Sequence, residues 1–229
     1  IALTAFALLW QSSANAQINA GTQIVNFHIG GALAQNKTAI TTWIAQEPKA
    51  AVTGVQLDGQ YLYSISPVLG IGGALSSSSR TKRYEGLVTG GGGKGTIINR
   101  SSTVKAEAIV RCILLPSKKV YPYIIGGVGF GKASVSAKAE PTDDDFWTDT
   151  GTQESRKIYD TANISGVSYS FGVGLEGSIS RSAVAGLAVR WATITGKTTV
   201  NHTINTGSWK FANSENLLLT ASIGWRFGK

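Results

Sequence analysis

The sequence has 229 residues, including 28 Gly, 1 Cys and no Met, and its 21 Lys and Arg against 13 Asp and Glu leave a formal net charge of +8. This length suits one domain of about average size or slightly larger. A single cysteine, Cys112, excludes an internal disulfide and with it the class of small secreted domains stapled by such bridges. The basic balance suggests anionic partners such as nucleic acid or phosphorylated lipid, although solvated basic loops are the favoured explanation.

The chain opens on an export signal. IALTAFALLWQSSANAQ has an apolar run over Ile1–Trp10, a polar segment and then Ala14-Asn15-Ala16, a small-x-small cleavage site. We therefore predict a signal peptide over 1–16, lacking its basic start, and a mature domain over 17–229; a short buried helix or strand is the alternative. No apolar run reaches the roughly 18 residues of a membrane-spanning helix. An exported protein is not expected to bind nucleic acid.

The rest of the chain alternates apolar and polar residues with a period of two, which predicts β-strands. The alternation is clearest over 103–114, where Val104 and Val110 fall on one face and Lys105 and Arg111 on the other. The face assignment of the Gly-rich strand over 120–136 is left open, and a β-bulge is plausible there. The predicted strands are 23–35, 53–65, 68–79, 103–114, 120–136, 165–178, 183–195 and 217–229.

Strand and connection lengths predict the class of barrel. Most strands have ten residues or more, against about five or six in soluble proteins and about nine to eleven for a tilted strand that crosses a bilayer. Short turns (66–67, 115–119, 179–182) alternate with long connections (36–52, 80–100, 137–164, 196–215). The fold class predicted is all-β: an eight-stranded antiparallel up-and-down transmembrane β-barrel with short periplasmic turns and long extracellular loops.

The polar face of these strands is too poor in charge for a water-facing surface and suits a narrow lumen in which acids pair with bases. The apolar face carries aromatic residues near the strand ends, as membrane barrels do at the bilayer interfaces. A soluble lipocalin-like ligand-binding barrel, with its apolar face inward, is the alternative. The predicted polar network of the lumen is His28, Asp58, Lys105, Glu107, Arg111, Glu176, Arg190 and Arg226, joined by Gln56 and Gln60.

Three segments resemble the outer-membrane β-barrel domain family, the small eight-stranded OmpA/OmpX-type barrels of Gram-negative bacteria. They are VYPYIIGGVGFG (Val120–Gly131), GQYLYSISPVLGIGGAL (Gly59–Leu75) and the terminal Trp225-Arg226-Phe227. The resemblance implies an outer-membrane location and a last strand that is read by the barrel-assembly machinery. Trp225 and Phe227 would be the aromatic positions of that signal, although Gly228 and Lys229 follow where many relatives stop at the phenylalanine.

The sequence contains no complete motif for phosphate binding, calcium binding or hydrolysis. GGGGKGT over 90–96 lacks the Ser or Thr that follows the lysine of a phosphate-binding loop, and DDDFWTD over 143–149 lacks the glycine of an EF-hand loop. No cofactor or metal is therefore expected, and cation or sugar binding by the acidic run is the alternative to a solvated loop. Only His28 and His202 are available as bases, with no serine and carboxylate placed by spacing to form a hydrolase site.

A barrel of eight strands has a lumen that side chains fill, so a general porin is not expected. We predict a non-enzymatic outer-membrane protein with a structural or surface-interaction role. Its expected partners are outer-membrane lipid and lipopolysaccharide, the assembly machinery, and a surface ligand at the loops 36–52, 80–100, 137–164 and 196–215. A lipid-modifying enzyme that uses His28 or His202 is the alternative.

Overall fold

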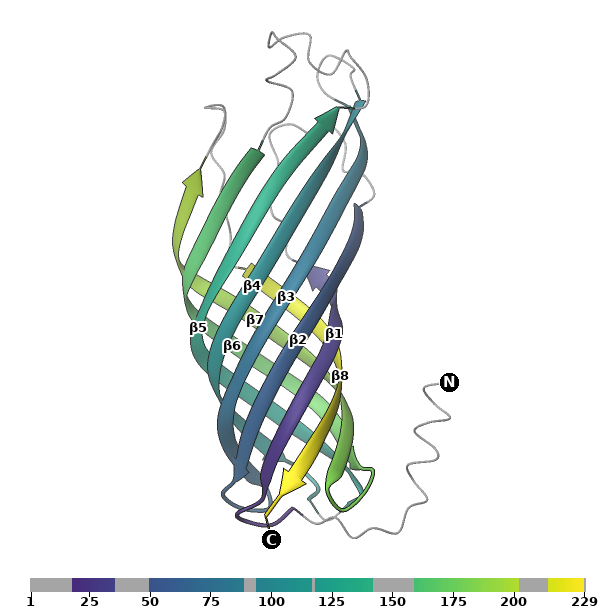
Figure 1. The fold of residues 1–229 in the computed structure, drawn as a ribbon, viewed down its shortest axis with the longest axis vertical. Coiled ribbons are helices and arrows are strands. Elements are labelled where there is room, and N and C mark those ends of the chain that lie inside the picture. The colour runs from purple at the N-terminus through teal and green to yellow at the C-terminus, as the bar shows by residue number, and fades with distance from the viewer. Residues whose placement is uncertain are drawn as a thin grey trace.

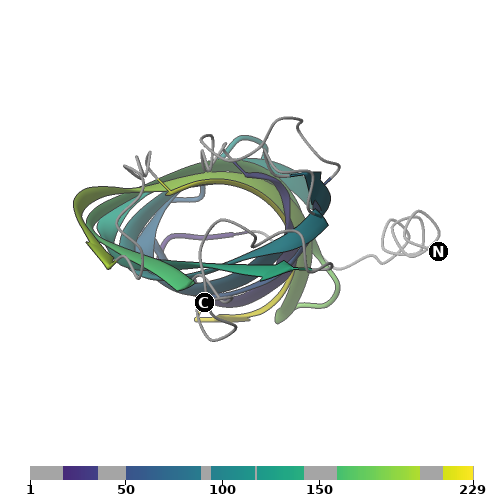
Figure 2. The same cartoon turned by 90° about the horizontal axis from the view of Figure 1, so that it is seen from above.

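The computed structural model describes residues 18–35, 50–88, 94–116, 118–141, 159–201 and 214–228. These residues form a closed barrel in which every strand pairs antiparallel with the next, and β8 closes the ring against β1 (Figures 1 and 2). The predicted fold class, an eight-stranded antiparallel barrel, is confirmed. The strands are β1 (Gln23–Gln35), β2 (Ala50–Ser64), β3 (Leu69–Val88), β4 (Lys94–Ile113), β5 (Val120–Pro141), β6 (Tyr159–Ser178), β7 (Ala183–Asn201) and β8 (Ser214–Phe227).

Several strands run further than the sequence predicted. The connection expected over 80–100 is mostly strand, because β3 and β4 stay paired from Arg80↔Ser101 to Val88↔Lys94, with one register shift between Tyr84 and Leu87. The expected loops over 36–52, 137–164 and 196–215 also lose residues to β2, β5, β6, β7 and β8. Alternation of hydrophobicity ends where the side chains leave the apolar zone, whereas backbone pairing continues beyond it.

The register settles the open face assignment of β5. Tyr121, Tyr123 and Ile125 point into the lumen, and Val128 and Phe130 point outward. Both ladders of this strand run without a shift, so the bulge considered for it is wrong. Glycine has no side chain to display the alternation, which is why the sequence alone left this strand undecided.

The two faces of the wall have opposite character. On β4 the outward Val104 and Val110 are 60% and 51% exposed, whereas the inward Lys105 and Arg111 are 6% and 2% exposed. A soluble ligand-binding barrel has the reverse arrangement, with charge outside and apolar residues within. The outward face suits lipid, and from Val104 to Leu114 it spans roughly 26 Å of bilayer, given about 3.4 Å per residue and a tilt near 40°.

β1 begins and β8 ends at the end of the barrel with the tight turns (Figure 1). There the chain just before β1 folds back into the mouth of the barrel. Gly21, with φ +86°, allows the bend, and its N–H donates to the Ser64 carbonyl at 2.8 Å. Residues 1–16, the predicted signal peptide, lie outside the described residues. The described part of the chain has no helix of the length and apolarity that a membrane span requires.

Candidate functional site in the barrel lumen

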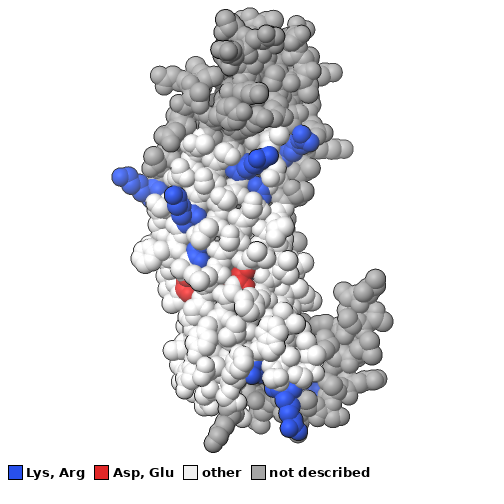
Figure 3. Space-filling model, in the orientation of Figure 1, with Lys and Arg blue, Asp and Glu red and all other residues white. Residues whose placement is uncertain are grey.

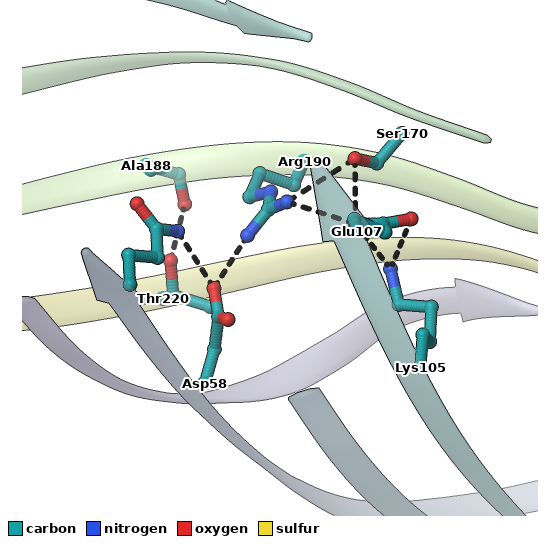
Figure 4. Close-up of polar contacts among 8 residues, drawn as sticks. Asp58, Lys105, Glu107, Ser170, Ala188, Arg190 and Thr220 are labelled. Atoms are coloured by element: carbon teal, nitrogen blue, oxygen red, sulfur yellow. Dashed lines mark hydrogen bonds and ion pairs between the residues drawn. The ribbon is translucent and has the colours of Figure 1, made fainter. Parts of the chain in front are cut away.

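Paired charges from three strands cross the middle of the lumen (Figure 4). Arg190 of β7 is the hub: its guanidinium forms an ion pair with Asp58 of β2 and lies 3.5 Å from the Glu107 carboxylate of β4. The Lys105 ammonium lies 3.3 Å from both oxygens of Glu107. These four residues, the Arg190 cluster, hold two acids and two bases and are neutral as a set.

Neutral side chains complete the Arg190 cluster. The Ser170 hydroxyl of β6 donates to Glu107 at 2.9 Å and accepts from Arg190 at 3.2 Å. The Gln60 amide donates to Asp58 at 2.7 Å. A buried ion pair is stable only when its remaining donors and acceptors are also satisfied, and these groups meet that need for most of the cluster.

A second set of paired charges, the Glu176 cluster, lies nearer the tight turns. The Glu176 carboxylate of β6 lies 2.8 Å from Nη2 of Arg111 and accepts a hydrogen bond from the Tyr121 hydroxyl. Arg226 of β8 donates to that hydroxyl at 2.5 Å, and the Asn26 amide donates to Glu176 at 3.2 Å. One acid against two guanidiniums leaves the cluster at +1.

The two arginines of the Glu176 cluster also form cation–π contacts with tyrosine rings. The guanidinium carbon of Arg111 lies 3.8 Å from the Tyr123 ring centre and 5.9 Å from that of Tyr121. Arg226 lies 5.6 Å from the Tyr121 ring centre. Cation–π attraction is strongest where both partners are withdrawn from water, as they are here.

Glycines on β6 make room for these long side chains. A Cβ added at Gly174 would lie 2.5 Å from the ring of Tyr123, and one added at Gly172 would lie 2.6 Å from Arg190 Cγ. Both distances are too short for a real contact. The glycine-rich lumen face of this strand therefore fits the bulky residues of its neighbours.

Ile18 closes the lumen at the tight-turn end. Its side chain is fully buried and packs in one apolar cluster with residues that include Ile24, Leu62, Ile113 and Tyr121. Thr22 N–H donates to the Asn19 carbonyl at 3.2 Å and helps to hold this turn. Below the charged clusters the lumen is thus filled by apolar side chains.

His28 occupies a different position from the other predicted lumen residues. Register places it between Asp58 of β2 and Ser222 of β8, on the same face of three adjacent strands. Within the described part of the chain, neither ring nitrogen has a hydrogen-bond partner. Asp58 is engaged by Arg190 and Gln60 instead. The row has the residue types of a hydrolase triad but not its hydrogen bonds.

All the residues predicted for the lumen network face the lumen, each 8% exposed or less. The structure divides seven of them between the two clusters and leaves His28 outside both. Trp225 and Phe227, the predicted assembly signal, face outward on β8 at 42% and 54% exposure. Gln56, also predicted, is buried.

Sequence reasoning missed Tyr121, Tyr123, Asn26, Ser170 and the buried Arg80, which it had assigned to a loop. The sequence does contain a pattern that could have assigned the tyrosines to the lumen. Val128 and Phe130 are large and apolar at even positions, which places the odd-numbered tyrosines on the other face. Nothing comparable marks Ser170 among the many serines of β6.

Other predicted features lie outside the described residues. His202 and the acidic run 143–149 belong to segments that the structure does not describe, as do most of 90–96. Among the described residues, no group of three or more His, Cys, Asp or Glu side chains could hold a metal ion.

No protein-family model matches the chain. No curated protein matches it either. Solved structures do match. The outer membrane protein OprG from Pseudomonas aeruginosa aligns at 13% identity and a TM-score of 0.55, over 94% of this chain and all of that one. A major outer membrane protein from Thermus thermophilus aligns at 13% identity and a TM-score of 0.52, over 90% of this chain and 99% of that one.

The outer membrane protease OmpT from Escherichia coli aligns at 11% identity and a TM-score of 0.50, over 90% of this chain and 94% of that one. The fold is that of outer-membrane β-barrels. At these identities the likeness concerns the fold alone, and the matched proteins include a protease. Function must therefore be argued from the lumen and the two faces of this barrel.

Proposed function

We propose that this chain is a non-enzymatic outer-membrane barrel with a closed lumen, which acts as a structural or surface-interaction protein through the connections at the end opposite its tight turns. The observation that carries the proposal is the filling of the lumen by the Arg190 cluster, the Glu176 cluster and Ile18. Eight strands enclose an interior that side chains can fill, and these do. The apolar outward face supports residence in a bilayer.

Conductance tests the closed lumen. The full chain, reconstituted into planar bilayers, is expected to show no steady ion current. A quadruple variant with Lys105→Ala, Glu107→Ala, Arg190→Ala and Ile18→Ser should conduct. A steady current from the wild-type barrel would contradict the proposal. A heat-modifiability gel on each preparation shows that the barrel has folded, because closed barrels resist SDS until boiled.

A role at the cell surface predicts that the segments over 142–158 and 202–213 matter more than the lumen. Replacing each with a short Gly-Ser linker should abolish the protein's contribution to cell-surface binding or envelope integrity in a deletion strain. A lumen variant such as Ser170→Ala should complement that strain fully. Full complementation by the loop-replaced chain would refute the surface role.

Export and assembly belong to the same proposal. Residues 1–16 act as the signal peptide, and the outward aromatic side chains of Trp225 and Phe227 are the features of β8 that the assembly machinery reads. Phe227→Ala should lower the amount of barrel in the outer membrane of cells while leaving refolding in micelles unchanged. Equal amounts of variant and wild-type barrel in the outer membrane would show that Phe227 is not part of the assembly signal. Outer-membrane lipid and lipopolysaccharide are then the partners of the outward face.

An enzymatic role has one observation in its favour, the row Asp58, His28 and Ser222. A lipid-modifying hydrolase would need Ser222 to be reactive, and a fluorophosphonate probe measures this directly. We expect no labelling, because His28 makes no hydrogen bond to either neighbour within the described residues. Labelling that disappears in Ser222→Ala and in His28→Ala would establish the enzyme, as would altered lipid A in a deletion strain.

A further inference from the structure

A row of cation, hydroxyl and cation crosses the outward face of β5, β6 and β7. Lys132 pairs in register with Ser165, which pairs in turn with Lys197, so the three side chains lie side by side on one face. All three are exposed. Adjacent strands are about 4.8 Å apart, which places the two lysines roughly 10 Å from each other with the serine between them.

The row marks the upper limit of the apolar zone. One row nearer the tight turns lie Phe130, Val167 and Thr195, and the Phe130 side chain is 74% exposed. One row further from the tight turns, Ser134 pairs with Asn163. The change from an outward aromatic side chain to lysine within two residues places Lys132 at the level where hydrocarbon meets head groups.

Among the side chains that the structure describes, no carboxylate lies beside Lys132 or Lys197. The acids whose side chains the structure describes, Asp58, Glu107 and Glu176, all face the lumen. Arg100 of β4 is also outward and exposed, and lies opposite Ser136, further along β5 from Lys132. In Figure 3 one group of basic side chains lies towards the end away from the tight turns and a second lies at the tight turns, with few between them.

We propose that Lys132, Ser165 and Lys197, flanked by Arg100, bind a phosphate group of a phosphorylated glycolipid in the outer leaflet. Lysine stems lie along apolar surface while their ammonium groups reach the head-group level, where they donate charge-assisted hydrogen bonds to phosphate. Ser165 donates a further hydrogen bond between them. The neutral Ser134 and Asn163 lie one row further from the apolar zone, where they can form hydrogen bonds with the hydroxyl groups of a sugar that carries the phosphate. Such hydroxyl groups belong to a glycolipid head group, and this favours a glycolipid over a phospholipid. The inference rests on the proposed membrane orientation.

Binding of lipid A to the full folded chain in neutral micelles, followed by native mass spectrometry, tests this site. Lys132→Gln with Lys197→Gln should weaken binding of bisphosphorylated lipid A about tenfold or more, since each removed surface cation weakens attraction to anionic lipid. Lys118→Gln with Arg181→Gln is the matched control, because it removes the same charge from exposed sites at the tight turns. The control pair should bind as the wild type does.

Dephosphorylated lipid A and phosphatidylglycerol are the comparison probes, and both should bind the wild type at least tenfold more weakly. The site is overturned if the double variant binds lipid A as tightly as the wild type, or if the control pair loses as much. Equal affinity for phosphatidylglycerol would show that the site binds any anionic lipid and would refute glycolipid recognition. A wild-type barrel without a heat-dependent gel shift would instead contradict the membrane barrel itself.

Discussion

The two faces of the barrel wall use the same kinds of charged residue in opposite ways. On the lumen face, Lys105 and Arg190 are buried and each lies against a carboxylate. On the outward face, Lys132 and Lys197 are exposed at the rim of the apolar zone. On the lumen face, a charged side chain is stable where an opposite charge lies beside it. On the outward face, a charged side chain is stable only at the level where the hydrocarbon of the bilayer ends.

The largest effect on stability is expected when a buried charge of the lumen loses its partner. Glu176→Gln removes the only carboxylate within contact of Arg111 in the described lumen. We expect a loss of about 3–5 kcal/mol in the free energy of unfolding, measured by urea denaturation in bilayers, because the Arg111 guanidinium then remains buried without the acid that it contacts. Adding Arg111→Met should restore part of the loss. A loss below about 1 kcal/mol would show that water, not Glu176, neutralises this cluster.

A charge placed on the outward face within the apolar zone should also be costly. Val128 lies outward on β5 and is 51% exposed. Val128→Arg should cost about 2–4 kcal/mol of stability in a bilayer, because a guanidinium near the midplane must leave water. Lys132→Arg, at the rim of the same strand, is the control and should cost nothing measurable. A neutral result for Val128→Arg would mean that this face meets water, as in a soluble barrel.

Overpacking the lumen should lower the free energy of unfolding by less than a change of buried charge does. It should lower it by more than the same substitution on the outward face. Gly174→Ala would bring a Cβ to 2.5 Å from the Tyr123 ring and push it away from Arg111. We expect a loss of about 1–3 kcal/mol in unfolding free energy, as for other overpacked interiors. Gly126→Ala is the matched control, because its Cβ would face outward with no atom nearer than 4.0 Å. Equal effects of the two changes would contradict a tightly filled lumen.

The smallest effect should come from a single methylene at the closed end. Ile18 is fully buried in the lumen, whereas Ile29 is 59% exposed on the outward face. Ile18→Val should lower the unfolding free energy by about 0.5–1.5 kcal/mol, and Ile29→Val by clearly less. The urea midpoints of the two variants measure the difference. Equal midpoints would show that Ile18 does not seal the barrel in solution.

Much of this architecture was accessible from the order of residues. Alternation assigned Lys105, Glu107 and Arg111 to one face of β4, and the structure has them there. The same reasoning ended β3 too early and placed Arg80 in a loop, because hydrophobic contrast fades beyond the bilayer while the ladder continues. It also failed on β5, where glycines carry no side chain to reveal the alternation.

By itself the sequence determined the period of two, the number and order of the strands and, outside β5, the residues of each face, because these depend only on neighbours along the chain. The pairing of the lumen charges depended on the tertiary structure. Arg190 of β7 meets Asp58 of β2 across 132 residues, because closure of the barrel brings these two strands to face each other across the lumen. Tyr121 meets Glu176 across 55 residues, because the register of β5 against β6 places them opposite each other. The register of β5, β6 and β7 aligned Lys132, Ser165 and Lys197, a row that no spacing along the chain could have indicated.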